Sequence, residues 1–105
     1  MTKLNFKNLD CEVRKIDYPD GQTGLELVAS DTERNIQNDL YPGESLGFAT
    51  VCLPRFKGNQ KQAALRNYAE MEGILEALET ANVVKRTGQQ ILSGYVFLPV
   101  VDILI

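Results

Sequence analysis

The feature that most constrains the fold of this chain is a run of apolar residues at helical spacing near position 70. Asn67 is of the type that caps helix N-termini, and Glu70 lies three residues on, where its carboxylate can reach back to the N–H group of the cap. Gly73 costs about 1 kcal/mol inside a helix relative to alanine, which indicates close approach of the helix to a sheet. The spacing predicts one long helix over residues 67–80. Its apolar stripe consists of residues at i, i+3, i+4 and i+7, namely Met71, Ile74, Leu75 and Leu78.

The segments on either side of this helix have the pattern of strands. Residues 11–18 and 25–29 predict a hairpin around a turn at Gly21, and a shift in the apolar phase near Lys15 predicts a bulge. Residues 48–53 predict a short strand, whereas residues 85–88 predict a turn. The β-prone residues 95–105 include Pro99, which predicts an edge position or a bulge. We therefore expect a single α+β domain over residues 1–105, a twisted and mainly antiparallel sheet with the long helix on one face.

Residues 30–47 are polar and rich in Asp, Asn and Gly. They predict a long surface loop with one short turn of helix and a turn at Tyr41, Pro42 and Gly43. A loop of this length in a compact domain is often functional.

Composition narrows the class of protein. A formal net charge of −3 argues against direct nucleic-acid binding, which usually needs a basic excess. The sequence shows neither an apolar run of about 18 residues nor a secretory signal, so we expect a cytoplasmic protein without a membrane span. Cys11 and Cys52 are expected to be free thiols that serve as packing, with a disulfide as the alternative if their strands are neighbours. No metal or other cofactor is expected.

The residues do not predict catalysis. The chain has no histidine, so the commonest general base near neutral pH is missing. Ser45 lies in a G-x-S-x-G sequence, but that motif needs a strand before it, a helix after it and a histidine partner. We therefore expect a protein that is not an enzyme.

Charged side chains gather in two sets that could contact a partner. The acidic set lies in or beside the loop and on the helix: Asp31, Glu33, Asp39, Glu44, Glu72, Glu76 and Glu79. The basic set precedes the helix: Arg55, Lys57, Lys61 and Arg66. If the acidic residues meet on one side, their local potential would exceed what the net charge suggests. The alternative for each set is an ordinary solvated surface.

Two parts of the chain resemble a family of small proteins carried by phages and conjugative elements of gut bacteria. The first is residues 67–78 with 82–84 and 93–96, and the second is residues 11–13 with Tyr18, Gly21, Leu25, Leu27 and Val28. That family is known only as a domain of unknown function, so it supplies no catalytic residues. The resemblance implies a mobile-element context, in which small acidic proteins are frequently inhibitors of host defence, including anti-CRISPR proteins.

Two functions follow as hypotheses. The first is an inhibitor in the cytoplasm of a bacterial host that binds a defence effector such as a Cas nuclease through the acidic set, because a nuclease presents a basic groove to nucleic acid. The second is an accessory module of the mobile element that binds nucleic acid or protein through the basic set. An edge strand would also allow a homodimer.

Overall fold

The chain folds into two four-stranded antiparallel sheets, and the computed structural model describes residues 2–53 and 61–105. The first sheet has the order β1 (Thr2–Phe6), β2 (Leu9–Asp17), β3 (Thr23–Ala29) and β4 (Ser45–Phe48). The second has the order β5 (Thr50–Val51), β6 (Gln62–Leu65), β8 (Val96–Ile103) and β7 (Val84–Ser93). The helical elements are α1 (Glu33–Gln37), the 3₁₀ turn η1 (Ala69–Met71) and α2 (Ile74–Thr80). None of the described helices is long and apolar enough to cross a membrane.

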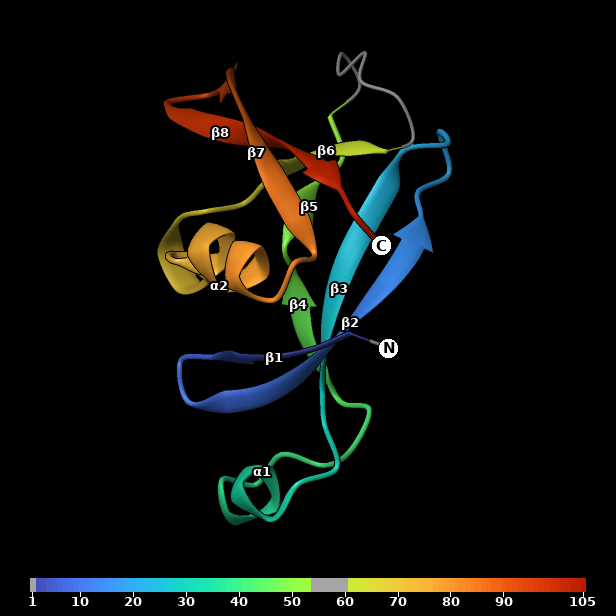
Figure 1. Cartoon of the computed structure of the whole chain (residues 1–105), viewed down its shortest axis with the longest axis vertical. Helices are drawn as coiled ribbons and strands as arrows, with labels where there is room; N and C mark the ends of the chain where they lie inside the picture. The colour runs from blue at the N-terminus through green and yellow to red at the C-terminus, as the bar shows by residue number, and fades with distance from the viewer. Residues whose placement is uncertain (1, 54–60) are drawn as a thin grey trace.

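The two sheets are joined at one edge by a single segment of chain. At their other edges they are bridged by α2. Ala49 is the single residue between β4 and β5, and its backbone bonds to both sheets: its N–H donates to Leu25 and its carbonyl accepts from Arg66. A strand that passes from one sheet to another in this way forms a corner. On the other side α2 contacts β1 and β7, which are the far edges of the two sheets (Figure 1).

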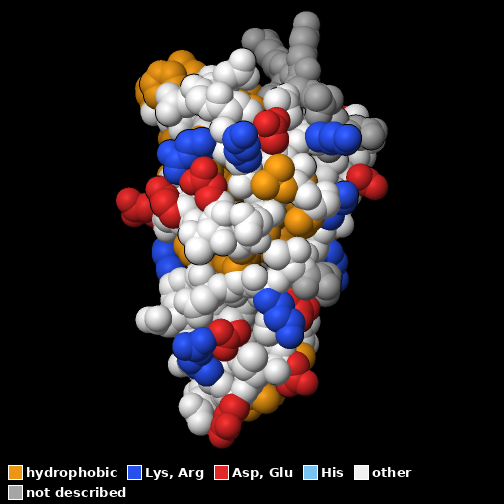
Figure 2. Space-filling view, in the orientation of Figure 1, with side chains coloured by type: hydrophobic (Ala, Val, Ile, Leu, Met, Phe, Trp, Pro, Cys, Tyr) orange, Lys and Arg blue, Asp and Glu red, His pale blue; other side chains and the backbone are white. Residues whose placement is uncertain are grey.

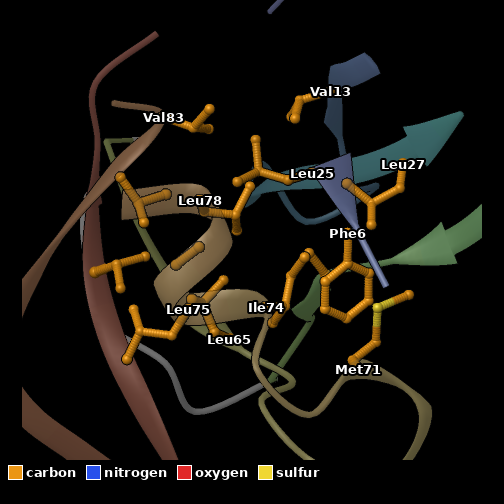
Figure 3. Packing of buried hydrophobic residues seen from close by; sticks show 14 of the residues in the cluster. Phe6, Val13, Leu25, Leu27, Leu65, Met71, Ile74, Leu75, Leu78 and Val83 are labelled. Carbon is orange, nitrogen blue, oxygen red and sulfur yellow. The ribbon is translucent and has the colours of Figure 1, made fainter. Parts of the chain in front are cut away.

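The core fills the space that these elements enclose. Leu25 and Leu27 of β3 point toward the apolar side of α2, and Phe6 lies beside Met71 (Figure 3). Met71, Ile74, Leu75 and Leu78 are all buried, as the helical spacing predicts.

The prediction of an α+β domain with a long helix over residues 67–80 is wrong. The described structure is mostly antiparallel strand, and α2 begins at Ile74 rather than near Asn67. Gly73 has a φ of +91°, outside the range of a right-handed helix, so the chain turns there and the helix starts afresh. The expected end of the helix is confirmed, because α2 stops at Thr80.

Asn67 does cap the helix, but from a distance. Its side-chain Oδ1 accepts hydrogen bonds from the N–H groups of Gly73 (3.1 Å) and Leu75 (3.2 Å). The apolar period across residues 71–78 survives the break because η1 leaves Met71 on the buried side. The period therefore located the buried face without revealing the interruption.

The strands agree only in part with those predicted from the sequence. The hairpin is confirmed as β2 and β3, but their register is continuous from Cys11 to Asp17, so the predicted bulge near Lys15 is absent. Residues 85–88 belong to β7 rather than to a turn. The register of β7 against β8 shifts between Arg86 and Gln90, so a bulge lies close to Pro99 but on β7, and Pro99 itself pairs regularly with Gln90.

Candidate functional site

Residues 30–44 of the predicted loop form one end of the molecule (Figure 1), whereas residues 45–47 belong to β4. This end contains α1, the expected short turn of helix, and lies at the lower tip of the long axis (Figure 1). Acidic side chains reach this tip, whereas the basic side chains visible in the same view lie above it (Figure 2). We call residues 30–44 the α1 loop.

The α1 loop is fixed to the first sheet by a fully buried amide. The Nδ2 of Asn35 donates to the carbonyl oxygens of Asp10 (2.7 Å) and Ser30 (3.0 Å), and its Oδ1 accepts from the N–H of Asp10 (3.1 Å). Thr32 caps α1 by accepting from the N–H of Asn35. The loop therefore has a defined shape, because three backbone groups would each lose a hydrogen bond if the amide moved.

Asp10 is the second part of this anchor. Its carboxylate accepts from the Thr32 hydroxyl (2.9 Å) and from the Nε (3.1 Å) and Nη2 (2.5 Å) of Arg34. The Arg34 guanidinium holds the pKa of Asp10 at about 2, below its ordinary 3.8. Arg34 is thus engaged with β2.

The four carboxylates of the loop, Asp31, Glu33, Asp39 and Glu44, are all on exposed residues. Glu44 also accepts a hydrogen bond from the N–H of Tyr41 (3.1 Å), which confirms the predicted turn at Tyr41. Because Arg34 is the single basic residue of the α1 loop, the loop has a formal charge of −3. That value is the net charge of the whole chain. Acidic and basic residues outside the loop therefore balance.

Apolar side chains accompany these carboxylates. Ile36 and Tyr41, both in the α1 loop, are exposed. A hollow of about 310 Å³ lies beside the loop and is lined in part by Lys3, Glu12 and Asp31. Exposed tyrosine is typical of surfaces that contact another protein.

The acidic residues of α2 and Glu72, which lies just before it, form a separate group. Glu72 and Glu76 are exposed, whereas Glu79 is paired with Arg86 (2.5 Å), which lowers the pKa of the Glu79 carboxyl. A second hollow, of about 410 Å³, includes Glu76 and again Lys3 in its lining. The acidic residues of the loop and of α2 thus lie on either side of β1 rather than in one cluster.

The predicted basic set is only partly described. Arg55 and Lys57 lie outside the described residues, and Lys61 is exposed. Arg66 pairs with Glu70 (2.5 Å) and stacks near the ring of Tyr68, with 5.6 Å to the centroid. Arg66 is therefore engaged within its own segment.

Ser45 and the two cysteines have structural roles. Ser45 donates to Glu26 (2.8 Å), a buried carboxylate that also pairs with Arg14. Cys11 is buried and Cys52 half-buried, and both are free thiols, as expected. Among the described residues, no group of three or more Cys, Asp or Glu is placed to hold a metal ion.

Sequence reasoning missed the anchor formed by Asn35 and Asp10. The local signal was limited to Thr32, a favoured N-cap residue, whereas the partner of Asn35 lies 25 residues away in the chain. Comparison of the chain with protein-family models, curated proteins and solved structures gave no match. The resemblance to the mobile-element family therefore stays a prediction.

Proposed function

We propose that this protein inhibits a host defence effector, most concretely a Cas nuclease, by binding it directly through the α1 loop. The observation that carries the proposal is the location of charge: the loop holds the whole net charge of the chain at one end of the molecule. A nuclease must present a basic groove to DNA or guide RNA, and a concentrated acidic surface is steered toward such a groove.

The construction of the loop supports binding rather than catalysis. The amide of Asn35 holds the backbone in place before contact, so less conformational entropy is lost when a partner binds. Ile36 and Tyr41 supply apolar contact area beside the carboxylates. Binding of this kind needs no cofactor and would act in the cytoplasm of a bacterial host, where the predicted effector works.

The test compares two charge-reversed variants that differ in location alone. Asp31→Lys with Glu33→Lys changes the α1 loop, and Glu72→Lys with Glu76→Lys changes the group at α2; both alter the net charge equally. We expect the loop variant to bind a guide-loaded Cas nuclease at least about tenfold more weakly, since each reversed exposed charge is worth up to about 1 kcal/mol. The α2 variant should retain binding and should still protect target DNA from cleavage.

Three outcomes would count against this proposal. An equal loss of nuclease binding in both variants would show that binding depends on the net charge of the protein and not on the α1 loop. A wild-type protein that protects no target from any nuclease tried would contradict the Cas assignment. Binding of single-stranded DNA that is lost in Lys61→Glu would favour the accessory module with the basic set instead. Thermal denaturation of each variant checks that the fold is intact.

A further inference from the structure

The second surface of interest is the far end of the β7–β8 hairpin, which extends beyond the rest of its sheet. β6 pairs with β8 at Val100 to Asp102 and not with the part of β8 nearer the turn. From Gln90 to Ser93 and from Val96 to Pro99, β7 and β8 pair with one another. We call these two paired segments, with the turn between them, the ribbon.

The ribbon exposes large apolar side chains on one face. Leu92 and Phe97 are cross-strand partners and are 60% and 61% exposed, and Tyr95 at the turn is fully exposed. Their neighbours Ile91 and Leu98 also pair, but on the other face, where Leu98 is buried. Figure 2 shows hydrophobic side chains gathered at this end of the molecule, at the upper left.

The edge of β7 has two different halves. Near Val84 the strand contacts α2, and Arg86 is ion-paired with Glu79 of that helix. The bulge around Gly88 separates this half from the ribbon, and Leu75 of α2 still lines a small hollow there. Beyond the bulge β7 remains the edge strand of its sheet, and such an edge offers backbone N–H and C=O groups to another strand.

The ribbon also lacks the charges that usually protect an edge. No Asp, Glu, Lys or Arg occurs between Thr87 and Val101. Natural edge strands commonly carry lysine or another charge to prevent pairing between copies. In a two-fold contact each patch meets its own copy, so an uncharged patch meets no like-charge repulsion. The acidic α1 loop, at the other end of the molecule, would be kept apart in such a contact.

From these features we propose that the ribbon is a self-association surface occupied by the ribbon of a second copy of this chain. The β7 edges pair antiparallel about a two-fold axis, so that Leu92 and Phe97 of both copies lie on the same face of one continuous sheet. Three exposed side chains supply less than the roughly 800 Å² per partner of a standard stable interface, so the dimer is expected to dissociate readily on dilution.

The experiment measures mass against concentration by sedimentation equilibrium, up to about 1 mM, the weak limit of specific association. Wild-type protein should pass from monomer to dimer in this range. Leu92→Lys with Phe97→Lys should raise the dissociation constant by at least about 100-fold, because it replaces the apolar side chains of this face with like charges on both copies. The matched control is Leu104→Lys with Phe48→Lys, which places the same substitutions at two other exposed residues. It should dimerise like the wild type.

A second measurement does not depend on any variant. Amide NMR shifts of the wild-type protein should change with concentration at residues 90–98 and stay constant in the α1 loop. A monomer at every concentration, or a dimer that both double variants weaken equally, would overturn the proposal. So would a monomer whose residues 90–98 shift when a different protein binds, because the ribbon would then serve another partner.

Discussion

Asn35 illustrates how a single polar side chain can define a surface. It is fully buried, and its amide bonds to backbone groups of Ser30, where the α1 loop begins, and of Asp10 in β2. Buried polar groups are stabilising when they are paired and costly when a partner is lost. The shape of the candidate binding surface therefore depends on a residue that no partner could touch.

Replacing Asn35 with alanine tests this dependence. The substitution removes the bond to the N–H of Asp10 and one of the two hydrogen bonds at each of the carbonyls of Ser30 and Asp10, so we expect a loss of about 1–3 kcal/mol in the free energy of unfolding. Asn38→Ala is the control, because Asn38 is exposed and bonds to the Arg34 carbonyl, and its cost should stay within about 0.5 kcal/mol. Urea denaturation measures both. Equal effects would mean that the amide is not the anchor.

Asp10 should make the stability of the protein depend on pH in acid. Its folded pKa of about 2 lies below the ordinary 3.8, so the folded state favours the carboxylate. Its contribution is therefore complete above pH 4 and is lost as the pH falls toward 2. The difference in stability between wild type and Asp10→Asn should shrink over this range in denaturation experiments. In Arg34→Met the pKa of Asp10, measured by NMR titration, should move back toward 3.8. An unchanged pKa would show that Arg34 is not its cause.

At the scale of elements, α2 shows what an apolar period can and cannot predict. The positions that face the core followed from their spacing, and all of them are buried. The interruption did not follow, because Gly73 is compatible with both a weak helix interior and a left-handed turn. The cap was also ambiguous, since Asn67 bonds to residues six and eight positions ahead rather than three. Gly88 is ambiguous in the same way, because glycine is common in both turns and bulges. The sequence therefore predicted a turn where β7 has a bulge.

Substitution of Gly73 distinguishes a continuous helix from one that is interrupted at this residue, because the two predict changes in stability of opposite sign. In a continuous helix, Gly73→Ala would stabilise the protein by about 1 kcal/mol. At a φ of +91°, alanine is strained, and we expect a destabilisation of about 1–2 kcal/mol. Gly73→Asn is the control, because asparagine tolerates positive φ better than alanine and should cost less. Thermal denaturation of the three proteins gives the order, and alanine as the most stable would contradict the break.

At the scale of the whole molecule, two surfaces of different character lie at the two ends of the long axis, which extends 40 Å. The turns at Gly21 and Tyr41, the β2–β3 hairpin and the presence of a polar loop could all be predicted, because each depends on neighbouring residues. The pairing of Asp10 with Asn35, the corner at Ala49 and the reach of the ribbon beyond β6 depend on contacts between distant segments. Those contacts decide which of the acidic residues share a surface, so the candidate site could be predicted as a set of residues but not as a shape.

The separation of these two ends has a consequence for stoichiometry. Two copies joined at the ribbon would carry their α1 loops outward, far from the shared axis (Figure 1). Such an assembly is bivalent, and both of its sites remain accessible at once. Two grooves on one target, or on two neighbouring targets, could then be engaged with an avidity that neither loop has alone, provided that their spacing matches. Dilution below the dissociation constant of the dimer would remove this gain while leaving each single site unaltered.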